Sequence, residues 1–148
     1  MDLVYLDYNC FQRGFDDPRQ VRLQMEALAG EEIFRRAEKK WIRLVWSFMH
    51  DDESDFCPFA DRKYEALRLG SLCDVEVKPT TAIQSAANSF VKQAHLSAKD
   101  AVHLACALSA RVDYFVTCDG QFLRQAQRLK LRIAIMNPVD YLQKKVIS

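Results

Sequence analysis

Short apolar segments alternate with longer amphipathic segments along the whole chain. Residues 3–7 begin with the β-prone run LVYL and end on Asp7, and comparable apolar runs recur at 42–47, 113–118 and 131–136. In most of the stretches between them, apolar residues recur every three or four positions, which is the spacing of one helix face. Strands that alternate with helices predict an α/β fold around a central, mostly parallel sheet.

The pattern also sets the expected limits of the helices. One helix starts near Pro18 and is expected to end at Gly30, because glycine often terminates helices, and a second, highly charged helix follows over 31–41. Further helices are expected at 48–56, 60–72, 80–94, 97–110, 120–130 and 137–146, with a short extended segment at 74–79. No linker, repeat or low-complexity segment interrupts the chain, so residues 1–148 are expected to form a single domain.

Composition narrows the class of protein. Hydrophobic residues make up 49% of the 148 residues, enough for a sizeable core, and the net charge of +1 means that a polyanion could be held only by a local basic patch. Five cysteines are scattered singly, which argues against a disulfide framework and a thiolate zinc site and suggests a reducing compartment. With no apolar run of bilayer length and no secretory signal, we expect a cytoplasmic protein without a membrane partner.

Four carboxylates stand where strands end or helices begin. Asp7 ends the first strand, Asp119 follows the strand at 113–118, Asp100 opens the helix at 97–110, and Glu53 lies in the acidic run HDDESD. At helical spacing Glu53 shares a face with Trp46 and Met49, with Asp52 as the alternative inward-facing acid.

Each of these acids also has an ordinary structural interpretation. Asp7 could close an Asx-turn together with Asn9, and Glu53 could belong to a solvated acidic run. Asp100 could complete a capping box with Ser97, and Asp119 could cap the following helix. His103, one turn after Asp100, is interpreted as a packed or hydrogen-bonded histidine rather than a metal ligand.

Taken together, the four acids favour a shared site. In open α/β sheets, ligands bind beyond the carboxyl ends of the strands, where three of these acids are expected to gather. Several carboxylates at one edge repel one another by several kcal/mol at low effective dielectric, and a divalent cation removes that repulsion. All-oxygen ligands favour Mg²⁺ or Mn²⁺, and such ions suit phosphoryl chemistry.

Basic residues near the same edge could hold a nucleic-acid backbone. Arg124 and Arg128 lie on the helix after Asp119, and Arg13 lies in the segment after Asp7. Phosphate contacts of this kind bind a backbone without reading its sequence, although any one of these arginines could equally be solvated helix surface.

Four segments resemble the PIN-domain ribonucleases. YLDYN at 5–9 is similar to the opening strand-Asp-x-Asn motif, and SAKDAVHLACALSARVDYFVTCD at 97–119 to the later helix-to-strand signature. LVWSFMHDDESD at 44–55 is similar to the segment that supplies a glutamate, and IMNPVDYL at 135–142 to the closing strand and helix. This chain departs from the family pattern at two places. Tyr8 stands where the family often has a small hydroxyl residue, and Gly120 and Gln121 follow Asp119 where many members carry another acid.

The resemblance implies a three-layer α/β/α domain that cleaves RNA endonucleolytically with Mg²⁺ or Mn²⁺. It implies that Asp7, Glu53, Asp100 and Asp119 form the metal-binding, catalytic quartet, with Asn9 and Thr117 as polar support. Compact members of the family are commonly VapC-like toxins of type II toxin–antitoxin pairs, which suggests a homodimer and a cognate antitoxin.

Two other functions remain open from the sequence. The chain could be a catalytically inactive PIN-like module that binds RNA or a protein, which the missing acid near Gly120 would favour. A phosphoryl-transfer enzyme with an aspartyl nucleophile would usually have a second acid two positions after Asp7, where Asn9 stands. The RNA target and the number of metal ions are not fixed by the residues.

Overall fold

A five-stranded parallel sheet forms the centre of the protein, which is described by a computed structural model over residues 1–12, 17 and 19–147. The strands are β1 (Leu3–Leu6), β2 (Arg43–Ser47), β3 (Val75–Val77), β4 (Tyr114–Val116) and β5 (Ala134–Met136). They lie in the order β3-β2-β1-β4-β5, and each neighbouring pair is parallel. The predicted α/β fold is therefore confirmed, with a sheet that is parallel throughout.

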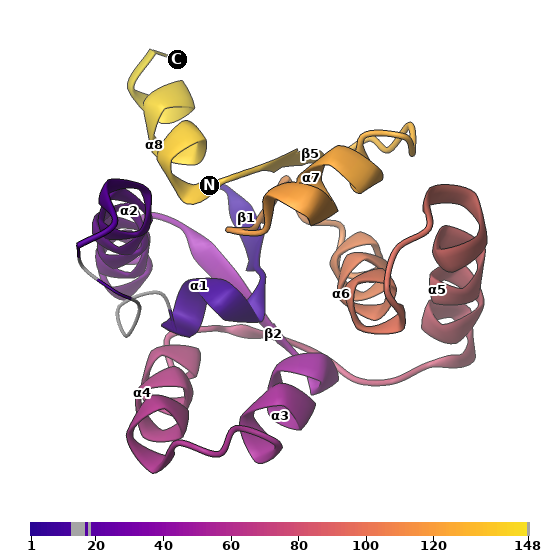
Figure 1. The fold of residues 1–148 in the computed structure, drawn as a ribbon, viewed down its shortest axis with the longest axis horizontal. Coiled ribbons are helices and arrows are strands. Elements are labelled where there is room, and N and C mark those ends of the chain that lie inside the picture. The colour runs from indigo at the N-terminus through magenta and orange to yellow at the C-terminus, as the bar shows by residue number, and fades with distance from the viewer. Residues whose placement is uncertain (13–16, 18, 148) are drawn as a thin grey trace.

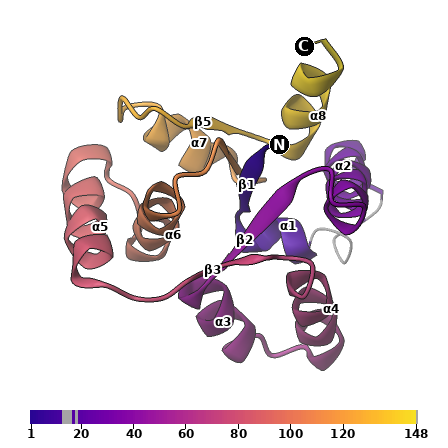
Figure 2. The same cartoon turned by 180° about the vertical axis from the view of Figure 1, so that it is seen from behind.

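Helices cover both faces of this sheet (Figure 1). Within the described residues they are α1 (Tyr8–Gln12), α2 (Val21–Glu38), α3 (Phe48–Asp55), α4 (Ala60–Gly70), α5 (Thr81–Ala94), α6 (Ala98–Ser109), α7 (Gly120–Ala126) and α8 (Pro138–Ile147). Figure 2, from behind, shows α5 and α6 on one side of the strands and α2 and α8 on the other. This is the three-layer α/β/α arrangement that the family resemblance implied.

Alternating residues of the central strands build two separate cores. Tyr5 of β1 and Phe115 of β4 face the core formed with α5, α6 and α7, whereas Leu6 and Val116 face the core formed with α1, α2, α4 and α8. Because both faces are covered, the strands read as continuous apolar runs rather than as alternating ones. This burial explains why LVYL and YFV stand out in the sequence.

The strand order places a topological switch point between β1 and β4. The chain moves from β1 outward to β2 and β3, then returns to the other side of β1 at β4 and continues to β5. Crossovers that leave in opposite directions open a crevice at the carboxyl ends of the two central strands, where ligands of such sheets bind. The residues after β1 and β4 therefore face each other at this position.

One predicted helix boundary is wrong, and one short helix was missed. Gly30 does not end a helix, because α2 runs from Val21 to Glu38 as one element. Gly30 lies on the buried face of α2 with Ile33 and Phe34, and burial of this face outweighs the roughly 1 kcal/mol that an interior helical glycine costs. The short helix α1 was not predicted after Asp7, since five residues give too little periodicity to recognise.

In the described part of the chain, no helix combines the length and apolar character needed to cross a bilayer. None of the five cysteines, all of which lie in the described residues, forms a disulfide.

Two helical glycines offer a matched test of packing. A Cβ at Gly70 would lie 2.6 to 3.0 Å from the ring of Trp46, which also stacks on His50, whereas a Cβ at Gly30 would meet only the Cys10 carbonyl oxygen at 3.8 Å. We expect Gly70→Ala to lower the free energy of unfolding by about 1–3 kcal/mol through overpacking. Gly30→Ala should be neutral or stabilising by up to about 1 kcal/mol through helix propensity.

Urea denaturation of both variants beside the parent protein measures these differences. Equal effects of the two substitutions would show that Trp46 is not held against Gly70 as the structure places it.

Candidate active site at the switch point

Asp7 is a buried carboxylate at the centre of the switch point. Its backbone N–H donates to the Val116 carbonyl at 2.8 Å, which extends the pairing of β1 with β4 by one residue. The side chain is fixed through Oδ2, which accepts from Thr117 Oγ1 at 2.8 Å and from Asn9 Nδ2 at 3.3 Å. The structure thus places Asn9 and Thr117 beside Asp7, where sequence reasoning expected polar support.

The surroundings of Asp7 disfavour its ionised form. Burial raises the pKa of Asp7 above its ordinary value of 3.8, although His103 and the Thr117 hydroxyl act in the opposite direction, and the neighbouring Glu53 raises the pKa further. A carboxylate whose ionised form is disfavoured by its surroundings is a common property of functional sites.

Glu53 is the acid of the acidic run that faces the site. Ser47 caps α3, since its hydroxyl accepts from Met49 N–H, and this fixes the position of the helix that carries Glu53. Glu53 is half-buried, while Asp52 and Asp55 are exposed and Asp51 accepts a hydrogen bond from Trp46 Nε1 at 2.8 Å. The structure therefore favours Glu53 over the alternative Asp52.

His103 lies between the two carboxylates, a position that sequence reasoning missed. Its Nε2 forms a hydrogen bond with Glu53 Oε1 and lies 4.0 Å from Asp7 Oδ1. The expectation of a hydrogen-bonded histidine agrees with this contact, but the partner was not anticipated. The available signal was the shared helical face of Asp100 and His103, which points both side chains toward the acids.

Asp100 stands at the outer side of the site, at the start of α6. Burial, followed by the charge of Asp7, raises the pKa of Asp100, and the charge of Asp119 raises it further. Asp100 is thus close enough to both acids to be affected by them. Its backbone N–H donates to Ser97 Oγ at 3.2 Å, so the predicted helix cap is also present.

Asp119 is exposed and caps α7. Its Oδ1 accepts from the backbone N–H groups of Gln121 at 2.9 Å and Phe122 at 3.2 Å. The ordinary N-cap interpretation therefore describes this carboxylate oxygen. Asp119 affects Asp100 through its charge, which raises the pKa of Asp100, rather than through a direct contact.

Three side chains are placed to hold a cation. Asp7, Glu53 and His103 each offer one ligand atom, and these atoms lie within 4.8 Å of one another. Two carboxylate oxygens and an imidazole nitrogen fit a divalent cation, whose charge would offset the burial of Asp7. Among the described residues this cluster does not include Asp100 or Asp119, so the structure gathers the predicted quartet only in part.

One basic side chain of the protein contacts the site. Lys99 Nζ lies 3.6 Å from Glu53 Oε2. Arg124 is exposed, and its Nη1 would lie 3.4 Å from a Cβ at Gly120, next to Asp119. Arg128 is exposed further along the chain, and Arg13 lies outside the described residues.

Comparisons with known proteins support the fold. No family model matches this sequence, and no curated protein matches it. The structure is similar to the crystal structure of FitAcB from Neisseria gonorrhoeae, with a TM-score of 0.58 and 16% sequence identity over 91% of this chain and 97% of that chain. At this identity the similarity shows a shared fold and nothing more about activity.

The buried carboxyl group of Asp7 makes the stability of the chain depend on pH. Because its folded-state pKa is raised, the folded protein binds more protons than the unfolded chain between 3.8 and that higher pKa, so stability falls as pH rises through this window. We expect Asp7→Asn, which carries no charge, to melt at a higher temperature than the parent protein at neutral pH in a chelating buffer.

Mn²⁺ should reverse this order. At a concentration of about 100 times its Kd, an ion that binds only the folded protein adds about 2.7 kcal/mol, and Asp7→Asn should gain little of this. Calorimetry with and without Mn²⁺ measures both effects, with the exposed Asp52→Asn as control. An Asp7→Asn variant that is less stable than the parent in chelator would mean that Asp7 serves the fold rather than the site.

Proposed function

We propose that this chain is a divalent-metal-dependent endoribonuclease and acts as the toxin of a toxin–antitoxin pair. The observation that carries the proposal is the buried carboxylate of Asp7 gathered with Glu53 and His103 at the switch point of a PIN-like sheet. The resemblance of the sequence motifs supports the choice of RNA as substrate. Mg²⁺ or Mn²⁺ is the proposed cofactor.

The residues divide the work of phosphodiester hydrolysis. A divalent cation in such a site supplies an activated water and neutralises charge on the phosphate. Asp7 and Glu53 would hold it, while Thr117 and Asn9 fix the orientation of the Asp7 carboxylate through hydrogen bonds. Asp100 lies at the outer side of the site, and its raised pKa would help its carboxylate to accept a proton near the substrate.

Loss of the inner or the outer acid should abolish cleavage. We expect purified Asp7→Asn and Asp100→Asn proteins to cut RNA at rates lower by about 100-fold or more in Mg²⁺ or Mn²⁺, as is typical when a charged participant is removed. Both substitutions keep the shape of the side chain, and gel analysis of a labelled RNA measures the rate.

The control is Asp55→Asn, which removes another exposed acid of the same acidic run and should retain the parent rate. Cleavage that persists undiminished in both Asp7→Asn and Asp100→Asn would exclude the proposed site.

An inactive binding module of the same fold is the second candidate. It is favoured by one observation, namely that Asp119 Oδ1 is already bound by two backbone N–H groups of α7. RNA affinity without turnover in either Mg²⁺ or Mn²⁺ would support this alternative over the nuclease.

A hollow beside Glu53 offers a place for a nucleobase. It has a volume of about 490 Å³ and lies between α3 and α6, where it is lined by Met49, Asp52, Glu53, Phe56, Ala98, Lys99 and Val102. The Phe56 ring is 85% exposed, and single-stranded RNA is commonly bound by stacking of bases on such rings. Lys99, which also faces Glu53, would contact the adjoining phosphate.

Phe56→Ala should weaken RNA binding without emptying the metal site. Base stacking on an aromatic ring contributes about 1–3 kcal/mol, so we expect the Kd for single-stranded RNA to rise by roughly 5- to 150-fold. Fluorescence anisotropy in the inactive Asp100→Asn background measures it. Tyr64→Ala, which removes another exposed ring from α4, is the control, and equal losses in both would place the RNA elsewhere.

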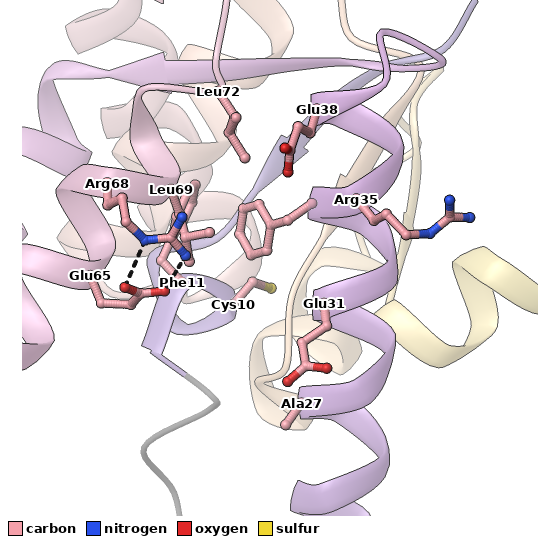
Figure 3. Close-up of a pocket in the computed structure, with 12 residues that line it drawn as sticks. Cys10, Phe11, Ala27, Glu31, Arg35, Glu38, Glu65, Arg68, Leu69 and Leu72 are labelled. Carbon is pink, nitrogen blue, oxygen red and sulfur yellow. Dashed lines mark hydrogen bonds and ion pairs between the residues drawn. The ribbon is translucent and has the colours of Figure 1, made fainter.

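An antitoxin would be held by the groove between α2 and α4 (Figure 3). The groove has a volume of about 380 Å³ and an apolar floor that includes Phe11, Phe34 and Leu69. Glu31 and Glu38 point toward it from α2, whereas Arg35 points away and pairs with Glu32 at 2.7 Å. Apolar and basic side chains of an antitoxin segment would complement this surface.

Charge reversal at Glu31 and Glu38 distinguishes this groove from other surfaces, since a complex of undiminished affinity would place the antitoxin elsewhere.

The expected homodimer remains a prediction. Exposed apolar residues on α2, namely Val21, Met25 and Leu28, are available for such a contact.

A further inference from the structure

His103 ends a line of hydrogen bonds that runs from the candidate site into the core. Its Nδ1 lies 2.6 Å from the Tyr5 hydroxyl, which lies 2.7 Å from Ser47 Oγ. Ser47 Oγ lies 3.2 Å from Nδ1 of His50. Tyr5, Ser47, His50 and His103 are each at most 1% exposed, so each hydrogen bond of this line is shielded from water.

The inner end of the line has a fixed direction. His50 Nε2 lies 2.7 Å from the Leu6 carbonyl oxygen, which can only accept, and His50 Nδ1 lies 2.9 Å from the Ser47 N–H, which can only donate. His50 is therefore the neutral Nε2–H tautomer. Burial, followed by the charge of His103, lowers the pKa of His50, which agrees with this assignment.

The two hydroxyl groups can then point in either of two directions. If Ser47 donates to Tyr5 and Tyr5 donates to His103 Nδ1, then His103 carries its proton on Nε2 and donates to Glu53. If Ser47 donates to His50 and Tyr5 donates to Ser47, then His103 Nδ1–H donates to Tyr5 and the lone pair of Nε2 faces the carboxylates. Every donor has an acceptor in both arrangements, since Met49 N–H donates to Ser47 Oγ at 3.2 Å in each.

The second arrangement needs a positive charge in front of Nε2. A lone pair directed at Glu53 Oε1 and Asp7 Oδ1 would be repelled by both, because carboxylate oxygens are acceptors only. A proton or a metal ion between these three atoms removes the repulsion. Metal-bound histidines regularly donate their other ring N–H to a fixed partner, and Tyr5 is placed as that partner.

We propose that His103 is a metal ligand through Nε2, and that Tyr5 and Ser47 are positioning residues that hold it as the Nδ1–H tautomer. The ion takes the place of the proton that otherwise lies between Nε2 and Glu53, and that proton leaves to water. This inference rests on the cation site of the proposed function, but it adds a nitrogen ligand to a set predicted to be oxygen alone.

The nitrogen ligand changes which ion the site prefers. Imidazole suits first-row transition metals, whereas Mg²⁺ binds oxygen ligands and keeps much of its water. A site of Asp7, Glu53 and His103 should therefore bind Mn²⁺ more tightly than Mg²⁺, and this preference should depend on His103.

Pulsed electron paramagnetic resonance of the Mn²⁺-loaded protein tests the ligand directly. We expect modulation from a directly bound imidazole nitrogen in the parent protein, and its loss in His103→Gln together with a smaller preference for Mn²⁺ over Mg²⁺ in calorimetric titrations. His95→Asn is the control, because His95 is exposed and asparagine tolerates its left-handed backbone at φ 57°. Bound Mn²⁺ without nitrogen modulation, or modulation that survives in His103→Gln, would overturn the assignment.

Tyr5→Phe tests the positioning role. It keeps the ring that stacks on Phe115 but removes the acceptor for Nδ1–H, so the Kd for Mn²⁺ should rise by about 10- to 100-fold and the nitrogen modulation should weaken. Tyr141→Phe, which removes a buried hydroxyl bonded to Asp2 in the other core, should leave both unchanged. An unchanged Kd in Tyr5→Phe would overturn the role of Tyr5.

The test separates this inference from the proposed nuclease activity, since it uses no RNA. Nitrogen-bound Mn²⁺ in a protein that does not cut RNA would sustain the ligand and overturn the activity. RNA cleavage with Mn²⁺ bound by oxygen alone would do the reverse, and a protein that binds no Mn²⁺ would overturn both.

Discussion

The buried negative charge of Asp7 is the constraint on which the site depends. An ionised carboxylate inside a protein is tolerated only where hydrogen bonds or opposite charges compensate it. Here Thr117 and Asn9 compensate one oxygen, while the other faces His103 and lies near the equally negative Glu53. The raised pKa of Asp7 shows that these contacts do not fully offset its burial. A cation at this position would complete the compensation.

The topology of the sheet explains how residues so distant in sequence meet at Asp7. Parallel strands with covered faces point all their carboxyl ends to one edge, and the reversal of strand order leaves the space beyond β1 and β4 uncovered. Asp7 and Thr117 are 110 residues apart, yet each follows the last residue of one of these neighbouring strands. Helix α3 then brings Glu53, and helix α6 brings His103, close to Asp7 at that edge.

Local pattern was enough to predict the parts of the fold that one segment decides alone. The buried strands, the helices α3, α5, α6 and α7, and the positions of Asp7, Asp100 and Asp119 relative to them follow from apolar runs, helical periodicity and the predicted caps of α6 and α7. Glu53 was selected over Asp52 by its helical spacing from Trp46 and Met49, but Trp46 lies in β2 rather than on α3, so only the contact of Glu53 with His103 shows which acid faces the site. Gly30 misled the prediction because its cost is offset by tertiary packing, which no local pattern contains.

The network behind His103 could not be predicted for the same reason. Tyr5 on β1, Ser47 after β2 and His103 on α6 lie next to one another only because three elements pack together. In the sequence each is an ordinary core residue, and a tyrosine in an apolar strand carries no sign of its hydroxyl partner. Sequence reasoning therefore found the charged residues, which stand out against apolar surroundings, and missed the neutral ones that orient them.

The two sides of the site differ in a way that fits a division of labour. On the inner side, Asp7, His103, Tyr5, Ser47 and His50 are all buried and fixed by hydrogen bonds, so their geometry cannot adjust to what binds. On the outer side, Lys99 and Phe56 are exposed and line a hollow that opens beside Glu53, and Asp119 is exposed as well. Rigid ligands suit a cation, whose coordination distances vary little, whereas exposed side chains suit a flexible strand of varied sequence. Glu53 is half-buried and contacts both His103 and Lys99, so it joins the rigid inner side to the exposed outer side.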